Sequence, residues 1–444
     1  MKTATTTLLV GGIVVGIGIA AYKLGQHSAS GDPPPVASTA SQQPAVSAPR
    51  ATDPQRSLPK PVTPAASPGA AADPHAGLPT SPVAGDAGPA EGGAIGHRFA
   101  HFRVGDSNVK AILADGPVMW VGTSGGVIRY DTRTEEHRLY DVRAGLLSNG
   151  IFHLSRLGDR LAVGTYGGGL SLFDESRDDW TNYNIQHGLG DAFIYDLLQM
   201  DNGDIWVATW SGANLVKDGK LDDAQAWTTF TVASTAGGLP NDWVYGLARG
   251  TDGEVWMATE GGLAWYRDGQ WRNWKHEDGL GAPYELVRDQ IEFQRDPAKE
   301  SSHHARQKVE MGLQGVDIAY NPNYIVSLHV DEAGTVWAGT WGGGLAHFDG
   351  KTWKNYTMAD GLPANHVFML EGAGNGAMWV GTSNGMAYFD GQRFDVLTTK
   401  DGLYANNVFS LARGDDGSLW VGSYGGVARL VGLSERFGVQ DVAN

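Results

Sequence analysis

The sequence contains no cysteine among its 444 residues. This absence excludes disulfide bonds, thiolate metal sites, a cysteine nucleophile and a lipoprotein anchor. Basic residues are also few relative to acidic ones, with 33 Lys and Arg against 49 Asp and Glu and a formal net charge of −16. A surface of that charge repels nucleic acid and anionic lipid headgroups, so we expect neither as a binding partner.

Amphipathic helices are missing as well, because no segment after residue 30 shows an apolar period of 3.6 residues. In contrast, 15 Trp and 63 Gly exceed ordinary usage. Trp and Tyr suit broad, half-buried strand surfaces, and Gly supplies the positive φ angles of tight turns. The composition therefore predicts an all-β chain.

One phrase recurs seven times along the chain: an apolar run, Trp, Val or Ala, Gly, Thr, a variable residue and a glycine pair. Its copies are centred on Trp120, Ala162, Trp206, Trp256, Trp337, Trp379 and Trp420. The period is about 41 to 50 residues with one longer gap, which indicates one supersecondary unit repeated along the chain.

Each unit contains short alternating runs joined by hairpin turns such as Asp416-Gly417, and full units add an outer run such as 353–357. Four antiparallel strands of this kind make one propeller blade. The run 97–104 reads as an outer strand without a blade of its own, and the last unit ends near Leu430 after its third strand. Pairing the two closes a ring and removes its open edges. We therefore predict a seven-bladed β-propeller of four-stranded blades over residues 96–435, closed by the N-terminal strand.

The gap between Trp256 and Trp337 is 81 residues, about one period too long. A degenerate eighth blade is one explanation, but the repeated phrase is missing between them. We favour an insertion over residues 281–322 in one inter-blade loop, containing a long hairpin or a helix. Long loops on a rigid scaffold are often functional.

The N-terminal 95 residues divide into a tail at 1–4, an apolar segment at 5–24 and a Pro- and Ala-rich stretch at 25–95. Twenty helical residues span roughly 30 Å, the thickness of a hydrocarbon core. We expect 5–24 to be a transmembrane signal anchor that places the propeller on the periplasmic or extracytoplasmic side, with a cleaved signal peptide as the alternative. The stretch at 25–95 is predicted to be a disordered linker, and 436–444 a C-terminal tail.

The units resemble the two-component regulator propeller repeat through their N-x-V-x-x-L run, D-x-G turn, L-W-V-G-T-x-G-G-L phrase and D-G-L-P-x-N link. The resemblance covers roughly residues 97 to 430. In that family such propellers are typically the exported sensor part of membrane-bound histidine kinases, often responding to polysaccharide fragments. The resemblance therefore implies a sensing propeller, although kinase, response-regulator and DNA-binding segments are not found in this sequence.

Propeller connectivity places two sets of loops on one face: the T-x-G-G turns and the D-G-L-x-x-N links. Aromatic rings beside short amides suit a sugar or a peptide. The predicted ligand-binding residues are Tyr166, Trp210, Trp341, Tyr424, Glu260, Trp243, His366, Asn241, Asn365 and Asn406. The alternative is that the asparagines cap turns and the aromatic rings wedge the blades together.

Catalytic motifs are weak. Ser124 and Ser383 fit the G-x-S-x-G pattern of a nucleophile elbow, but sister repeats carry Tyr, Trp or Glu at that position, so both serines read as turn residues. The pair His303-His304 has no zinc-binding spacing around it. We predict no catalytic residue, no cofactor and no metal site.

Three functions remain open at this point. We favour a membrane-tethered, exported propeller that binds a glycan, peptide or protein in a sensing or interaction role without catalysis. The second is a propeller enzyme, such as a polysaccharide or lactone lyase or a hydrolase, with its acid and base drawn from Glu260, His366 or the carboxylates of the insertion. The third is an assembly scaffold or accessory subunit of a membrane protein complex.

Overall fold

The computed structural model describes residues 99–291, 308–309, 311, 313–316, 318–433 and 437. The predicted anchor at 5–24, the linker at 25–95, His303-His304 and nearly all of the C-terminal tail lie outside these residues. Within the described ranges, no helix is long and apolar enough to cross a membrane.

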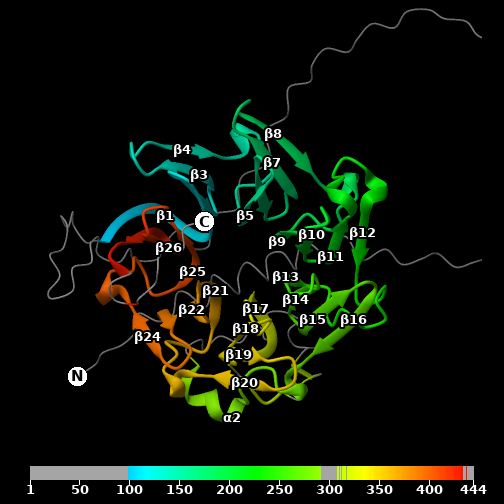
Figure 1. Cartoon of the computed structure of the whole chain (residues 1–444), viewed down its shortest axis with the longest axis vertical. Coiled ribbons are helices and arrows are strands. Elements are labelled where there is room, and N and C mark those ends of the chain that lie inside the picture. The colour runs from blue at the N-terminus through cyan, green and yellow to red at the C-terminus, as the bar shows by residue number, and fades with distance from the viewer. Residues whose placement is uncertain are drawn as a thin grey trace, which may run out of the picture. The chain divides into compact units, whose positions relative to one another are not determined.

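The strands form six antiparallel sheets that follow one another around a ring (Figure 1). The first sheet contains six strands: β25 (Val408–Arg413), β26 (Leu419–Leu430), β1 (Phe99–Asp115), β2 (Val118–Thr123), β3 (Gly126–Asp131) and β4 (His137–Tyr140). The second sheet contains β5 (Ile151–Leu157), β6 (Arg160–Thr165), β7 (Leu170–Asp174) and β8 (Asp179–Tyr183). The third sheet contains β9 (Ile194–Gln199), β10 (Ile205–Thr209), β11 (Gly212–Val216) and β12 (Trp227–Phe230).

The remaining three sheets contain β13 (Val244–Arg249), β14 (Val255–Thr259), β15 (Gly262–Arg267), β16 (Gln270–Trp274); β17 (Asn321–Val330), β18 (Val336–Trp341), β19 (Leu345–Phe348), β20 (Trp353–Tyr356); and β21 (Val367–Gly374), β22 (Ala377–Thr382), β23 (Gly385–Phe389), β24 (Phe394–Leu397). The all-β class is confirmed.

The predicted count of seven blades is wrong, because the strands form six sheets. The reason lies in β1, which runs without a break for 17 residues. Its first part pairs with β26, from Phe99 opposite Leu430 to Arg103 opposite Gly426, and its second part pairs with β2. The last and first repeats therefore share one continuous six-stranded sheet instead of forming two separate blades.

Short helical turns occupy the links between sheets and, at 217–219 and 224–226, the connection between β11 and β12 within one sheet. They are η1 (Val142–Ala144), η2 (Ile185–His187), η3 (Lys217–Gly219), η4 (Ala224–Ala226), η5 (His276–Asp278), α2 (Tyr284–Val287), η6 (Arg288–Gln290), η8 (Met358–Asp360) and η9 (Thr399–Asp401). The D-G-L motif of the repeat corresponds to such a turn: Gly361 ends η8 with a φ of 101°, a conformation that glycine adopts without strain.

The repeated phrase owes its tryptophan to packing between sheets. Trp120 is fully buried and contacts Phe173 of the next sheet edge-on, with ring centroids 6.0 Å apart. Trp206 contacts Tyr266 of the following sheet in the same way at 5.0 Å. Both rings thus pack against the neighbouring sheet.

The glycine and the threonine of the repeated phrase are needed for two different structural reasons. A Cβ on Gly381 would lie 2.8 Å from Val408 Cγ1, so the strand must lack a side chain where the next inner strand approaches. The Thr382 hydroxyl donates to the Gly385 carbonyl at 2.9 Å and closes the turn between the second and third strands. Five other repeats close this turn with the same threonine: Thr123, Thr165, Thr209, Thr259 and Thr340.

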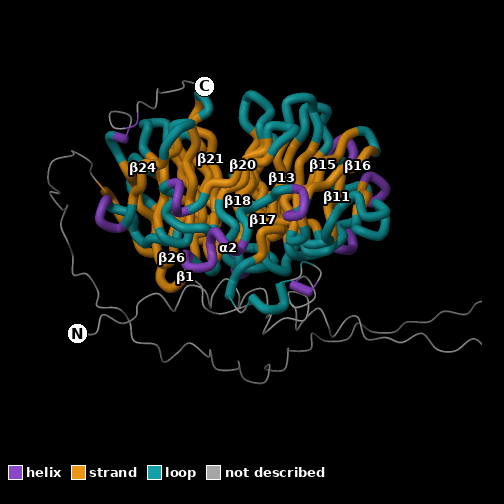
Figure 2. The backbone as a smooth tube through the Cα atoms, turned by 90° about the horizontal axis from the view of Figure 1, so that it is seen from below, coloured by secondary structure: helices purple, strands orange, loops and turns teal. Residues whose placement is uncertain are grey.

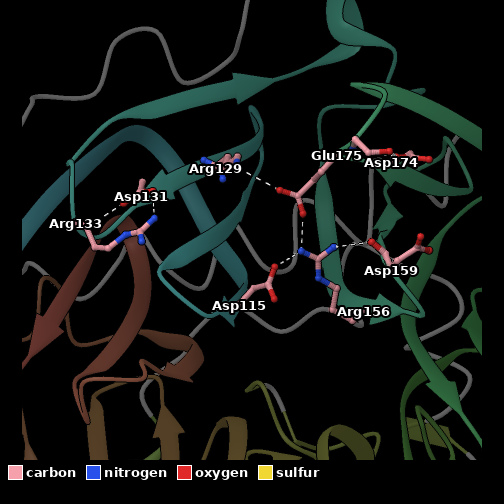
Figure 3. Close-up of polar contacts among 9 residues, drawn as sticks. Asp115, Arg129, Asp131, Arg133, Arg156, Asp159, Asp174 and Glu175 are labelled. Atoms are coloured by element: carbon pink, nitrogen blue, oxygen red, sulfur yellow. Dashed lines mark hydrogen bonds and ion pairs between the residues drawn. The ribbon is translucent and has the colours of Figure 1, made fainter.

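The strands run between two faces covered by loops (Figure 2). The inner strand of each sheet begins beside the T-x-G-G turn, as Val109 pairs with Thr123, so we call this end the mouth face. The far face lies at the other ends of the inner strands. There the Arg156 guanidinium lies between the Asp115 and Glu175 carboxylates, 2.6 Å from Glu175, and ties the first two repeats together (Figure 3).

The two ends of the 281–322 insertion pack on each other. The Tyr320 hydroxyl donates to the Ala282 carbonyl at 2.7 Å, and the two residues share a small core with Val287, Ile291 and Val316. The described parts contain the single turns α2 and η6 and no strand before β17, which begins at Asn321. The described parts thus lack the strands of an eighth blade.

Candidate ligand-binding surface

A ring of aromatic side chains lines the inner strands. We call it the aromatic collar; it consists of Phe152, Tyr195, Tyr245, Tyr324, Phe368 and Phe409. Ring centroids are 4.9 Å apart for Phe152 and Tyr195, and 4.8 Å apart for Tyr195 and Tyr245. Tyr324 follows at 4.8 Å from Tyr245, and Trp341 connects Tyr324 to Phe368. The collar thus crosses six successive inner strands: β5, β9, β13, β17, β21 and β25.

Backbone bulges place most of the collar. In β5 the pairing register shifts between Ile151 and His153, which leaves Phe152 as the extra residue. The same irregularity surrounds Tyr195, Tyr245, Phe368 and Phe409. A bulge re-aims the side chain of its extra residue. These five aromatic side chains therefore leave their strands in the same way, towards the middle of the circle of sheets.

A second tier of rings lies on the mouth face and touches the collar. Tyr166, Phe193, Trp210 and Trp243 contact one another in sequence, with centroids 4.7, 5.2 and 4.4 Å apart. Tyr166 also lies 5.6 Å from Phe152 of the collar. All four rings are partly exposed. Together the two tiers form one continuous aromatic surface, and its partly exposed rings on the mouth face are of the kind that stacks on sugar rings or apolar side chains.

A carboxylate adjoins this surface. The Tyr245 hydroxyl donates to Glu260 Oε2 at 3.3 Å, and the Glu260 residue is 0% exposed. Burial, and then the Glu260 charge, raise the pKa of both Tyr245 and Tyr324 well above the usual range. Both phenols therefore stay protonated at physiological pH and act as hydrogen-bond donors.

Two of the predicted site residues form a buried wedge. Trp341 is 2% exposed and His366 is 1% exposed, and their rings meet edge-on at 4.9 Å. His366 Nε2 donates to the Ala319 carbonyl at 3.0 Å, so the end of the insertion covers this pair. Burial lowers the pKa of His366 to about 3, which keeps the ring neutral.

The predicted amides hold turns. Asn365 Oδ1 accepts from the Met358 backbone N–H at 3.0 Å, and Asn406 Oδ1 accepts from the Thr399 N–H at 2.9 Å. Asn241 Oδ1 accepts from the Trp243 N–H at 2.8 Å. These bonds match the turn-capping alternative. Of the ten predicted residues, the structure gathers Tyr166, Trp210 and Trp243 on the open aromatic surface, with Glu260 directly behind it and Tyr424 partly exposed beside β1.

Sequence reasoning missed the collar itself. The signal was present, because the residue after the central Val or Ile of the N-x-V-x-x-L run is aromatic in five repeats. The first repeat carries Lys110 at this position, and its pairing shifts between Val109 and Ala111 in the same way. Lys110 therefore occupies the collar position of the first repeat.

The repeats and the ring of sheets define the chain as a β-propeller. A family model described as two component regulator propeller matches residues 238–261 and 405–425, so the propeller contains repeats of this type and the resemblance is confirmed. No curated protein matches the chain.

Solved structures share the fold at low identity. The extracellular domain of the hybrid two component system BT3049 from B. thetaiotaomicron is 18% identical with a TM-score of 0.57, and the alignment covers 74% of this chain and 40% of that chain. The chain thus spans well under half of that relative. Virginiamycin B lyase from Staphylococcus aureus is 10% identical, with 75% and 99% covered and a TM-score of 0.52.

YCF48 bound to D1 peptide is 11% identical, with 75% and 95% covered and a TM-score of 0.50. At these identities the likeness shows the fold alone. One propeller fold carries a two-component extracellular domain, a lyase and a peptide-bound protein among these three neighbours, so function must be argued from the site.

Proposed function

We propose that this protein is a sensing or interaction propeller that binds a ligand at the mouth face without catalysing a reaction. The observation that carries the proposal is the continuous aromatic surface made by the collar and by the partly exposed rings of Tyr166, Phe193, Trp210 and Trp243. Concave sites lined by aromatic rings with a few polar groups are the usual form of small-ligand sites. The matching repeats of the two-component regulator type support a sensing role.

The site favours binding over catalysis. General acid and base groups must lie within hydrogen-bond reach of substrate. Glu260 is completely buried, and His366 is buried under Ala319 with a pKa of about 3. Neither group can exchange protons with a ligand at the aromatic surface unless the structure around it rearranges. A lyase or hydrolase would therefore need other residues than these two.

We further propose that the propeller is tethered to a membrane by residues 5–24 and lies on its extracytoplasmic side. Support comes from the apolar character of that segment and from the extracellular location printed for the BT3049 domain. Fusions of a reporter after residue 95 test the location. Activity of a cytoplasmic reporter alone would contradict it.

Binding to glycan and peptide arrays tests the function, with the full-length protein and the variant Trp210→Ala. We expect Trp210→Ala to lose at least tenfold in affinity for the ligand that wild type selects, because Trp210 contacts both Phe193 and Trp243 on the open surface. Trp271→Ala is the matched control, since Trp271 lies on the outer strand β16 and contacts Phe230 and Tyr266.

Equal losses in the two variants would mean that binding follows general stability and not the mouth face. Full binding by folded Trp210→Ala would place the ligand elsewhere on the molecule. Either result contradicts the proposal.

A further inference from the structure

A cavity of about 490 Å³ lies on the far face, between the second and third sheets. One wall is the turn between β5 and β6, and the other is residues 219–223 of the connection between β11 and β12. None of its lining residues belongs to the aromatic surface of the mouth face. Small-ligand sites have volumes of about 300–1,000 Å³. We call this space the far-face cavity and treat it as a second candidate site.

The wall from the third sheet is a departure from the repeat. The connection between β11 and β12 has ten residues, 217–226, whereas the five other connections between a third and a fourth strand have two to five. It contacts the second sheet, where the Tyr183 hydroxyl donates to Asp222 Oδ1 at 3.0 Å. Burial and this bond to Asp222 raise the pKa of Tyr183 to about 12. A longer loop on a rigid scaffold often carries a function.

The wall from the second sheet is fixed by the charged network of the far face. The Arg156 guanidinium, which pairs with the Glu175 carboxylate, also donates to the backbone carbonyl of Asp159 at 3.3 Å (Figure 3). This bond holds the turn through its backbone, so the side chains of Asp159 and Arg160 are not used by the network. Within the described residues, neither side chain makes a hydrogen bond or an ion pair.

The lining of the far-face cavity combines buried apolar side chains with charged ones. Leu172 and Leu221 are buried, and Leu157 is half-buried. The charged lining residues are Asp159, Arg160, Lys220, Asp222 and Asp223. Lys220 Nζ already pairs with the Asp218 carboxylate at 2.9 Å. Arg160 is therefore the lining cation that is left for a ligand, beside three carboxylates.

These charges favour a ligand that carries both signs. A simple anion would pair with Arg160 but would be repelled by the three carboxylates, and a simple cation would leave Arg160 without a partner. A guanidinium group matches a carboxylate with two parallel hydrogen bonds. The carboxylates of Asp222 and Asp223 suit an ammonium group, and the leucines suit an aliphatic side chain.

We propose that the far-face cavity binds a short zwitterionic peptide with aliphatic side chains. Arg160 contacts the carboxylate of the peptide, and Asp222 and Asp223 contact its ammonium group. An aliphatic side chain of the peptide packs on Leu157 and Leu172. This site is additional to the mouth face and does not depend on the proposed function.

The test removes one charge of the ligand at a time. Titration calorimetry on the full-length protein at pH 7 measures binding of leucyl-leucine, of its N-acetyl form, which lacks the ammonium group, and of its amide, which lacks the carboxylate. We expect each blocked dipeptide to bind at least tenfold more weakly than leucyl-leucine. Diglycine, which has both charges and no aliphatic side chain, should also bind at least tenfold more weakly.

Two variants assign the charges to residues. Arg160→Met should lose at least tenfold in affinity for leucyl-leucine and no longer distinguish it from the amide. The double variant Asp222→Asn with Asp223→Asn should no longer distinguish leucyl-leucine from the N-acetyl form. Asparagine keeps the oxygens that accept from the Tyr183 hydroxyl and the Gln225 N–H, so the wall should remain in place. Arg393→Met is the control, because Arg393 is exposed in the turn between β23 and β24.

The other outcomes overturn the inference. Failure of leucyl-leucine to bind, or equal binding of the blocked dipeptides, excludes a zwitterion site and leaves the proposed function to the array experiment. Equal binding of diglycine excludes the packing on the leucines. Unchanged selectivity in folded Arg160→Met and in the folded double variant places the dipeptide elsewhere. If Trp210→Ala loses dipeptide binding and Arg160→Met keeps it, the dipeptide binds at the mouth face, which supports the proposed function alone.

Discussion

Individual side chains near the aromatic surface are of two kinds, those that stabilise the fold and those that lower its stability. Trp341 and His366 belong to the first kind, because both are buried and His366 is fixed to Ala319. Lys110 belongs to the second, because burial desolvates its charge. Groups that cost stability are commonly retained for function.

Replacing Lys110 should therefore stabilise the protein. The native pKa of about 8 lies below the ordinary value of 10.5, so the unfolded chain binds the extra proton between these two pH values. Wild-type stability is then lowest below pH 8 and rises between about pH 8 and 10.5. We expect Lys110→Met to be more stable at pH 7 by on the order of 1–3 kcal/mol.

Denaturant unfolding at pH 7 and at pH 10 measures this difference, which should shrink at the higher pH. Lys351→Met, which replaces an exposed lysine in the turn before β20, serves as the control and should stay within about 0.5 kcal/mol of wild type at both pH values. A Lys110→Met variant less stable than wild type at pH 7 would contradict the lowered pKa.

Replacing each of two tryptophans of the predicted site should lower the free energy of unfolding by clearly different amounts. Trp341→Ala removes a buried ring that contacts Tyr324, His366 and Phe368, and should lower the free energy of unfolding by about 3–5 kcal/mol. Trp210 is partly exposed, so Trp210→Ala should lower the free energy of unfolding clearly less. Similar losses in the two variants would mean that the mouth-face ring is as structural as the buried one.

Within one repeat, the second strand carries the most restrictive positions. The glycine of the W-V-G-T phrase lies where the β-branched residue of the next inner strand approaches, as with Gly122 and Ile151, or Gly381 and Val408. The third and fourth repeats place Ala208 and Ala258 at this position, so the approach is less close there. The residue at this position of the phrase, glycine or alanine, thus reflects how closely the next inner strand approaches.

Adding one methyl group at such a glycine should overpack the contact. In Gly381→Ala the new Cβ would lie 2.8 Å from Val408 Cγ1 and 2.9 Å from the Val408 carbonyl oxygen. We expect a loss of about 1–3 kcal/mol in thermal or denaturant unfolding. Gly315→Ala is the control, because no atom of the described residues lies within 4 Å of its added Cβ. A Gly381→Ala variant as stable as wild type would show that the two strands can move apart freely.

For the whole molecule, the decisive contact joins the two ends of the repeat array. The pairing of β1 with β26 connects residues more than 300 positions apart and leaves no open edge between the last and first repeats. The Ser410 hydroxyl, which donates to the Val109 carbonyl at 2.9 Å, adds a second link at the same junction.

Removing the closing strand should destabilise the whole propeller. A chain that begins at Gly105 loses the five paired residues Phe99–Arg103. At about 1 kcal/mol for each lost hydrogen bond, we expect a decrease on the order of 3–5 kcal/mol and a broader unfolding transition. A chain that begins at Gly96 keeps the pairing and is the control. Identical melting of the two chains would mean that closure contributes little.

Deleting Gly31–Gly93 tests the linker prediction, which lies outside the described residues. The composition predicts disorder, so the melting temperature of the propeller should remain within about 2 °C of wild type, since a loss of 1 kcal/mol shifts it by several degrees at most. A larger decrease, seen by calorimetry, would show that this segment packs on the propeller.

The sequence alone was enough to predict the all-β class and the repeat. These features are local and periodic: alternation and turn residues recur in every unit, and a Trp at fixed spacing recurs in six of the seven, so each copy supports the others. The signal for the collar was equally periodic, since an aromatic residue follows the central Val or Ile in most repeats, but only the bulge in each inner strand shows where that side chain is aimed.

Tertiary structure decided the rest, because it depends on contacts between distant parts of the chain. The continuity of β1 with both β26 and β2 makes six sheets out of seven repeated phrases. The return of the insertion at Ala319 buries Trp341 and His366, which by sequence alone look like exposed turn residues. The neighbouring strand β5 places Phe152 under the Lys110 ammonium. A repeat determines what each unit builds, whereas hydrogen bonding and packing between units determine which of its side chains remain open to a ligand.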